Sequence, residues 1–327
     1  MGTPTLPTPD DVLAAQRRIT PYIIQTPMLR HDLLDRLTGG TILLKAEPLQ
    51  RTGSFKLRGA TNALRLLPTA ARAHGVVTYS SGNHGQAIAC AAAALDMQAT
   101  IVMPADAPAI KQDATARFGA RIVTFDRMRE NREAIATEIA KSAGAILIPP
   151  YDHADVIAGQ GSAALELAAD AAAIGRGMDA LLVCTGGGGL TAGCALAMQA
   201  ASPATAIFAV EPEGWDDTAR SLAADMRLAN DRTGSMLCDA LLAPEPGTLT
   251  FAINRLYLAG GLVVTDEEVK AAMRFAALHL KLVVEPGGAV ALAAVLAGKI
   301  DAKSRVIGVV ISGGNADPAL LSAVLAG

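Results

Sequence analysis

The sequence is poor in aromatic and in charged residues. Aromatic side chains make up 3% of the 327 residues, charged side chains make up 18%, and the formal net charge is only −3. Nucleic acids and anionic membranes bind strongly basic surfaces, which this charge balance does not provide. Neither kind of partner is therefore expected.

Cysteine and histidine are also scarce, and their spacing fits no metal site. The five histidines form no HxxxH pair, and the four cysteines form no CxxC pair and lie among small apolar residues. A disulfide or a zinc site is therefore not expected. We interpret the cysteines as small core residues of a protein in a reducing compartment: Cys90, Cys184, Cys194 and Cys238.

A long apolar run is missing as well. The charge-free stretch Pro286 to Gly298 lies between Glu285 and Lys299. It is too short for a bilayer, which requires about 20 residues. The first residues, 1–7, have neither the basic nor the apolar part of a signal peptide. We therefore expect a cytoplasmic protein.

Apolar runs typical of β-strands are present, and helical stretches separate most of them. This alternation is typical of an α/β fold with parallel sheets covered on both faces, and the chain is long enough for two lobes. Paired prolines at Pro149 and Pro150 predict a linker, because they continue neither a helix nor a strand. The predicted strands are Val76–Tyr79, Thr100–Met103, Arg121–Phe125, Ala145–Ile148, Ala180–Val183, Ala206–Val210, Leu262–Val264 and Val306–Ile311.

Lys56 is a candidate nucleophile. It follows a Gly53-Ser54 turn and stands between Phe55 and Leu57. Burial would disfavour its ammonium form and lower its pKa, which an amine needs in order to attack a carbonyl such as the aldehyde of pyridoxal phosphate (PLP). The alternative is a lysine that extends its charged end to solvent.

A run of four glycines, Gly186 to Gly189, follows the predicted strand 180–183 and precedes a helical stretch. Glycines let the backbone approach an anion closely, and the amides at a helix N-terminus bind phosphate. The pattern does not match G-x-G-x-x-G, because Thr191 occupies the place of the last glycine. A phosphate that does not belong to a nucleotide is favoured; a dinucleotide loop or a plain turn remains the alternative.

Two more polar motifs stand at predicted strand ends, Ser80 to Ala87 and Ser312 to Asn315. Together with Lys56 and the glycine run, they resemble in order and spacing the fold-type II PLP enzymes, whose fold is similar to the tryptophan synthase β-subunit. Within that family the motifs resemble the threonine/serine dehydratases (ammonia-lyases) and the serine racemases. Four matches in order are more specific than any one alone.

The resemblance implies a division into two lobes, each with a mainly parallel sheet. A small substrate-binding lobe, 76–151, would be inserted in a large PLP-binding lobe made of 1–75 and 152–327. A homodimer is expected on the same ground.

The resemblance also implies how PLP is held. Lys56 would bind the aldehyde covalently, and Asn83 would contact the phenolic oxygen of the ring. Ser312 would form a hydrogen bond with the pyridine nitrogen, which suits elimination better than transamination; a plain Ser-Gly-Gly turn is the alternative. The full set of implied cofactor contacts is Phe55, Lys56, Asn83, Gly186, Gly187, Gly188, Gly189, Leu190 and Ser312.

The same likeness implies a substrate site at the start of a helix, where free amides favour a carboxylate. Ser80, Ser81, Asn83 and His84 would bind the substrate carboxylate, unless the motif is only a helix cap. In serine racemases a serine at the place of Ser81 is the acid and base opposite the lysine, whereas many threonine dehydratases carry alanine there. Arg132 aligns with an arginine that reaches a dicarboxylate-like ligand in serine racemases; a solvated helix face is equally consistent with it.

The resemblance also implies a hard-cation site at Glu211, Trp215 and Asp217. Two carboxylates and the Trp215 main-chain carbonyl would suit Mg²⁺ or Ca²⁺ in a structural or activating role. Relatives often have a small residue in place of Trp215. An acidic turn without a metal is the alternative.

These observations predict a PLP-dependent L-threonine/L-serine dehydratase, which releases a 2-oxo acid and ammonia by β-elimination of water. Racemisation of serine by Lys56 and Ser81 remains open, as does dehydration of 3-hydroxyaspartate with Arg132 as the extra carboxylate contact. A β-replacement enzyme is disfavoured by the sequence of the Ser80 loop. A nucleotide-binding dehydrogenase or a non-catalytic ligand sensor is the alternative from a different class.

Overall fold

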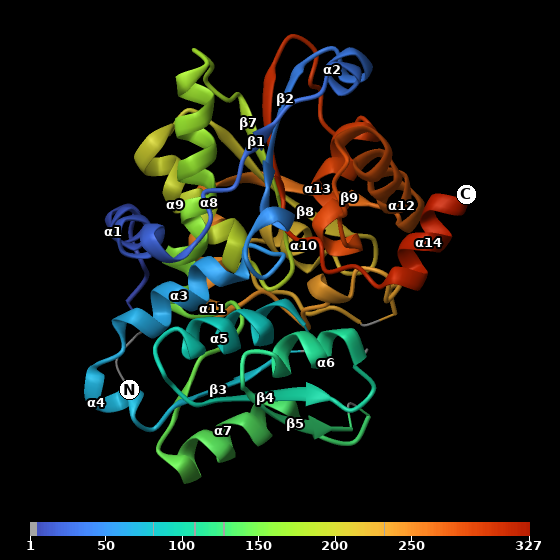
Figure 1. Ribbon diagram of the computed structural model, residues 1–327. Coiled ribbons are helices and arrows are strands. Elements are labelled where there is room, and N and C mark those ends of the chain that lie inside the picture. Colours follow the sequence, from blue (N-terminus) through green and yellow to red (C-terminus); the bar gives the residue numbers. More distant parts are fainter. Residues whose placement is uncertain (1–4, 81, 108, 127, 232) are drawn as a thin grey trace.

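The computed structural model describes residues 5–80, 82–107, 109–126, 128–231 and 233–327. It contains a six-stranded sheet in the order β1-β2-β10-β7-β8-β9 and a four-stranded sheet in the order β5-β4-β3-β6 (Figure 1). All strand pairs are parallel except β1 with β2. The predicted α/β class with parallel sheets is therefore confirmed.

The strand bounds agree with most of the predicted runs. The large sheet contains β1 (Met28–Leu29), β2 (Thr41–Ala46), β7 (Ala180–Cys184), β8 (Ala206–Pro212), β9 (Leu258–Val264) and β10 (Val306–Ile311). The small sheet contains β3 (Val76–Tyr79), β4 (Ala99–Pro104), β5 (Arg121–Phe125) and β6 (Ile146–Leu147). The run predicted at 145–148 forms a strand over only two residues, and neither β1 nor β2 was predicted as a strand.

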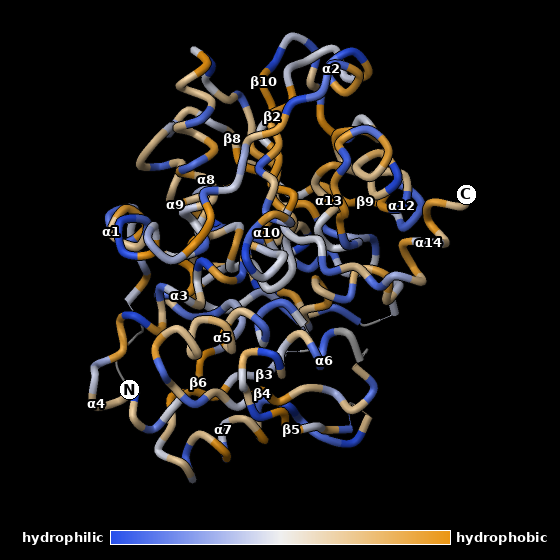
Figure 2. Tube along the Cα trace, viewed as in Figure 1, coloured by the Kyte–Doolittle hydropathy of each residue, from blue (hydrophilic) through white to orange (hydrophobic). Residues whose placement is uncertain are grey.

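Helices cover both faces of the large sheet, as a parallel sheet requires. Leu43 of β2 packs with one set, α1 (Pro9–Ile19), α8 (Ala154–Ala173), α9 (Gly189–Ala201) and α11 (Thr248–Tyr257). Its neighbours Ile42 and Leu44 pack with α2 (Asp32–Thr38), α12 (Asp266–Phe275), α13 (Pro286–Leu296) and α14 (Pro318–Ala326) on the other face. Apolar residues are correspondingly dense along the strands of the large sheet and along α13 (Figure 2).

The small sheet is enclosed in the same way. Val76 packs with α3 (Lys56–Leu66) and α5 (Asn83–Ala93), whereas Val77 packs with α7 (Arg132–Ala143) on the opposite face. Three further helices are α4 (Thr69–Arg72), α6 (Ala109–Ala116) and α10 (Asp217–Ala224). The lobe boundaries at 75 and 152 remain a prediction.

Helix α3, which begins at Lys56, is held firmly to the large sheet. The Phe55 amide donates to the Ser312 carbonyl at 3.0 Å, next to a bridge between Ser54 and Gly313. Where α3 crosses α8, a Cβ on Gly159 would lie 2.6 Å from the Gly59 Cα, so the two backbones are in direct contact. Lys56 and Ser312 thus keep a fixed relation to each other.

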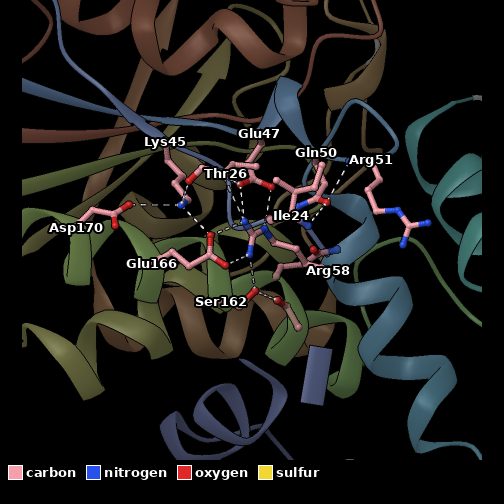
Figure 3. A network of polar contacts seen from close by, with 12 residues as sticks. Ile24, Thr26, Lys45, Glu47, Gln50, Arg51, Arg58, Ser162, Glu166 and Asp170 are labelled. Carbon is pink, nitrogen blue, oxygen red and sulfur yellow. Dashed lines mark hydrogen bonds and ion pairs between the residues drawn. The ribbon is translucent and has the colours of Figure 1, made fainter. Parts of the chain in front are cut away.

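A buried polar network fixes the same helix from the side (Figure 3). Arg58 of α3 is fully buried and forms paired hydrogen bonds with the carboxylates of both Glu47 and Glu166. Lys45 of β2 forms an ion pair with Glu166 at 2.7 Å. The network joins α3 to β2 and to α8.

Within the described ranges, no helix combines the length and the apolar character needed to cross a bilayer. The charge-free stretch from Pro286 forms α13, and its residues through Val295 are buried in the core. It is a core helix, as its length indicated.

Candidate functional site

A cavity opens where strands β3, β7 and β10 end, and most of the predicted site residues line it. Carboxyl ends of parallel strands meet at one edge of a sheet, which is where such folds bind ligands. Glu211, Trp215 and Asp217 lie elsewhere, and Ser81 lies outside the described residues. The predicted residues that line the cavity are Phe55, Lys56, Ser80, Asn83, His84, Arg132, Gly186, Gly187, Gly188, Gly189, Leu190 and Ser312.

Lys56 projects into this cavity from the first residue of α3. Its Nζ donates a hydrogen bond to the Pro150 carbonyl at 2.8 Å and lies 5.1 Å from the centroid of the Phe55 ring. Burial lowers the pKa of Lys56 to about 8, although the nearby Glu285 carboxylate opposes the shift. A substantial fraction of the amine is therefore neutral near pH 8, as the sequence predicted for a nucleophile.

The glycine run forms a turn between β7 and α9. Gly188, the N-cap residue of α9, has φ of 89° and offers no side-chain cap. A Cβ on Gly187 would lie 2.4 Å from ring atoms of Tyr151, and one on Gly189 would lie 3.0 Å from the Tyr151 backbone. Only glycine fits here, and the amides at the start of α9 have no side-chain cap, as a phosphate site would require.

Asn83, at the start of α5, lies between two further polar groups. Its side-chain amide donates to Glu285 Oε1 at 2.6 Å, and its oxygen accepts from Asn315 at 2.7 Å. Burial raises the pKa of Glu285 to about 7, with Asp239 adding to the rise and Asn83 opposing it. Sequence reasoning did not identify Glu285; the one signal was an acid at the boundary of an apolar run.

The opposite side of the cavity comes from the small sheet. His84 is buried, and its pKa is lowered to about 3, first by burial and then by the charge of Lys56. Its neutral ring therefore donates from Nε2 to the Ile148 carbonyl at 3.3 Å. The Ser80 hydroxyl oxygen accepts from the Gly82 amide at 3.2 Å, just before α5 begins.

Arg132 enters the cavity from the first residue of α7. Its guanidinium carbon lies 5.5 Å from the centroid of the Tyr79 ring. None of the described carboxylates forms an ion pair with it. The cavity therefore contains a cation that is available to an acidic ligand.

Tyr151, Lys111 and Asp239 are among the other cavity residues that were not predicted. Tyr151 lies against the glycine run, and Lys111 of α6 forms an ion pair with Asp239 of a short 3-10 helix, Asp239–Leu241. All three line the cavity. Residues 111 and 239 are 128 positions apart in the chain, so no local spacing indicated their contact.

The candidate cation site lies between β8 and α10. Both oxygens of Glu211 accept backbone amides, from Thr218 at 2.9 Å and Ala219 at 2.8 Å. One oxygen of Asp217 accepts from Asn230 at 2.6 Å, and the other is buried without a partner among the described residues. Burial raises the pKa of both carboxyls, that of Asp217 to about 6, and their mutual repulsion raises that of Glu211 further.

This donor set fits a hard cation, because two buried carboxylates gain from a positive neighbour. No group of three or more histidine, cysteine or acidic side chains suited to a metal occurs in the described ranges. The cation site therefore stays a prediction.

Comparison with known proteins decides the family. A family model described as "Pyridoxal-phosphate dependent enzyme" matches residues 19–313. The chain belongs to this family. It is 42% identical to an L-threo-3-hydroxyaspartate ammonia-lyase of Saccharomyces cerevisiae, covering 98% of this chain and 97% of the relative. It is 41% identical to a serine racemase of Schizosaccharomyces pombe, covering 95% of each.

Solved structures agree with this assignment. A threonine deaminase, from the source abbreviated T.th., superimposes with a TM-score of 0.90 and 42% identity, covering 95% of this chain and 99% of that chain. A maize serine racemase superimposes with a TM-score of 0.92 and 35% identity, covering 98% of each. The predicted fold-type II architecture, the PLP cofactor and an enzyme of the lyase and racemase group are thereby confirmed.

The cavity itself fits PLP. A lysine with a lowered pKa stands near a glycine turn that excludes any Cβ, and a serine at the end of β10 lines the same space. Lys56 would hold the aldehyde end, Gly186 to Gly189 the phosphate and Ser312 the pyridine nitrogen. These individual roles remain predictions.

Proposed function

We propose that this enzyme removes water from a small 3-hydroxy amino acid and releases a 2-oxo acid and ammonia. Threonine and serine were the substrates predicted first. The cavity favours the acidic alternative, 3-hydroxyaspartate. The observation that carries this choice is Arg132, a cavity cation without a carboxylate partner among the described residues.

The charge balance of the cavity supports an acidic side chain. Lys111 is already neutralised by Asp239 and Lys56 would hold PLP, so among the described cavity residues Arg132 is the cation left for a second carboxylate. A guanidinium binds a carboxylate through two parallel hydrogen bonds and gains from a partly desolvated setting. Threonine and serine have no second carboxylate with which this guanidinium could pair. Two of the relatives carry the name L-threo-3-hydroxyaspartate ammonia-lyase, which agrees with the choice.

Each wall of the cavity would have its own task. Bound PLP supplies an electron sink that makes the Cα proton of an attached amino acid acidic. Lys56, with its pKa near 8, takes that proton and then has a proton to give to the departing hydroxyl. The amides at the start of α5, beside Ser80, bind the α-carboxylate. Loss of water and hydrolysis of the resulting enamine convert 3-hydroxyaspartate into oxaloacetate and ammonia.

The test compares two substrates in two arginine variants. In Arg132→Gln, kcat/KM for L-threo-3-hydroxyaspartate should fall about 10- to 100-fold, which corresponds to a lost charged hydrogen-bonded contact. The value for L-threonine should change little. Arg129→Gln is the matched control, because Arg129 is 86% exposed, pairs with Asp126 and does not line the cavity. Equal losses on both substrates, or no loss on either, would refute the assignment.

A second variant tests the reaction type. Lys56→Ala should lose covalent attachment of PLP, measured by borohydride reduction and peptide mass mapping, together with all turnover. Chiral chromatography after incubation with L-serine measures racemisation in the same preparation. An active Lys56→Ala enzyme would contradict the mechanism, and D-serine formed faster than keto acid would replace elimination by racemisation as the main activity.

A further inference from the structure

The segment Pro150 to Asp152, between β6 and α8, contacts three parts of the cofactor site. The Pro150 carbonyl accepts the hydrogen bond from Lys56. Tyr151 packs against the glycine run at Gly187. Asp152 accepts hydrogen bonds from the start of α11. Three consecutive residues therefore connect the reactive amine, the glycine turn and a neighbouring helix.

Asp152 supplies the cap that α11 does not have locally. The N-cap residue of α11 is Gly247, which offers no side-chain cap. The Asp152 carboxylate instead accepts the amides of Thr248 at 2.9 Å, Leu249 at 2.8 Å and Thr250 at 3.2 Å. A carboxylate here satisfies free amides and interacts favourably with the helix dipole. The position of the first turn of α11 thus depends on the linker.

Helix α11 in turn holds the glycine turn. The Gly187 carbonyl accepts the Thr250 hydroxyl at 2.7 Å and the Gly247 amide at 3.2 Å. A Cβ on Gly188 would lie 2.9 Å from the Asn254 side-chain nitrogen, so the turn rests directly on α11. Any shift of the first turn of α11 is passed to the amides at the start of α9.

We propose that Asp152 is a positioning residue that sets the glycine turn relative to Lys56. PLP must reach the amine with its aldehyde and the turn with its phosphate, so its affinity depends on the distance between them. Pro150 positions the Lys56 amine and Asp152 positions the glycine turn, and the two residues are two positions apart in the chain. The inference rests on the proposed role of Gly186 to Gly189 in phosphate binding, and not on which amino acid is the substrate.

The first measurement is the dissociation constant of PLP from the apoenzyme, without substrate. Asp152→Ala should raise it about tenfold, the effect of losing roughly one helix cap, and should shift the ³¹P resonance of the bound phosphate. Asp152→Asn keeps one acceptor oxygen and should show a smaller rise. Asp317→Asn is the control, because Asp317 caps α14 through two backbone amides far from the cavity, and its PLP affinity should equal that of the wild type. Unchanged affinity in Asp152→Ala would overturn the proposal.

A double variant separates positioning from simple capping. A Cβ on Gly247 would lie 2.4 Å from the Asp152 carboxylate and 2.8 Å from the Thr250 hydroxyl oxygen, so Asp152→Ala removes the nearest obstacle to a new side chain at 247, and the Thr250 hydroxyl has to shift slightly. Adding Gly247→Asp restores a cap to α11 without linking it to Pro150. The melting temperature of the apoenzyme should recover, while the PLP dissociation constant should stay raised. Recovery of both would mean that Asp152 is only a helix cap.

A glycine variant tests the underlying assignment. Gly188→Ala should weaken PLP binding whatever residue occupies position 152, because Gly188 has φ of 89° and no room for a Cβ. Normal affinity in Gly188→Ala would overturn the phosphate role of the turn, and the inference with it. None of these measurements uses a substrate, so a wrong substrate assignment would leave them unchanged.

Discussion

Replacing Arg58 by Met should lower the free energy of unfolding by about 3–5 kcal/mol, the usual effect of removing one partner from a buried ion pair. Arg58 is fully buried and donates to Glu47, Glu166 and Ser162 (Figure 3). Met fills a similar volume, so the loss comes from charge and hydrogen bonding and not from a cavity. Lys45 still pairs with Glu166 in the variant. Glu47 would keep only the hydrogen bond from the Thr26 hydroxyl.

The loss of Arg58 should also change how the free energy of unfolding depends on pH. Burial would raise the pKa of Glu47, but the charge and hydrogen bonds of Arg58 outweigh it and the net pKa is lowered. In the wild type this contribution to stability is present above the unfolded pKa of 4.5 and is lost as the pH falls through the lower folded value. In Arg58→Met, only the Thr26 hydrogen bond and the charge of Lys45 oppose the effect of burial, so the pKa of Glu47 should rise and its protonation should stabilise the variant as the pH falls. The difference between the two proteins should therefore shrink from pH 8 to pH 5.

Urea unfolding of the apoenzymes, followed by far-ultraviolet circular dichroism, measures both effects through the shift of the midpoint. Lys270→Met is the control, because Lys270 and Glu267 form an exposed ion pair, and exposed pairs contribute little to stability. Arg58→Met with Glu47→Gln removes the unpaired carboxylate and should recover part of the loss. A difference below about 1 kcal/mol that does not vary with pH would refute the reasoning, since a buried carboxylate without a partner is far more costly.

Three further predictions concern other parts of the molecule. The pKa of Glu285 rises from 4.5 in the unfolded state to about 7 in the folded state, so the contribution of this group to stability is present below pH 4.5 and is lost as the pH rises towards 7. The melting temperature of Glu285→Gln minus that of the wild type should therefore be larger at pH 8 than at pH 5. Millimolar Mg²⁺ or Ca²⁺ should raise the wild-type melting temperature but not that of Asp217→Asn, and equal shifts would exclude a cation between Glu211 and Asp217. Gly159→Ala should lower stability by about 1–3 kcal/mol through the clash with the Gly59 backbone, whereas Gly177→Ala, with nothing within 4 Å, should be neutral; similar urea midpoints for the two would contradict the close contact of α3 and α8.

Most strands of both sheets could be predicted because each is an apolar run between helical stretches; β2 (Thr41–Ala46) is such a run too, but it was not predicted as a strand. Val306–Ile311 and Val76–Tyr79 are buried on both faces, so their sequences are continuous apolar runs and not alternating ones. The antiparallel strand Met28–Leu29 has only two residues and no such signal. The predicted run 145–148 forms a strand of two residues, because it pairs with β3 only at Ile146 and Leu147.

The sequence also indicated that the residues predicted to hold PLP would lie close together, and they line one cavity. Lys56, Gly186 to Gly189 and Ser312 each adjoin a turn or a strand end, and parallel strands bring their carboxyl ends together. Glu285 and Tyr151 gave no comparable signal. Glu285 is defined by its contact with Asn83, more than 200 residues away in the chain, and Tyr151 by its contact with Gly187. Such residues become functional candidates only through tertiary packing.

The two sheets contribute different groups to the same cavity. Substitutions in the two sheets should therefore affect different properties of the enzyme. Lys56 and Ser312 are joined through the Phe55 amide, and the glycine turn leaves β7 of the same large sheet. Ser80 and Arg132 come instead from β3 and α7 of the small sheet. Apart from Asn83, which begins α5 on the small sheet, the groups expected to hold PLP thus keep their geometry even if the small sheet shifts, whereas those expected to bind the substrate move with it. We therefore expect small-sheet substitutions to alter KM and substrate preference, and large-sheet substitutions to alter PLP affinity first.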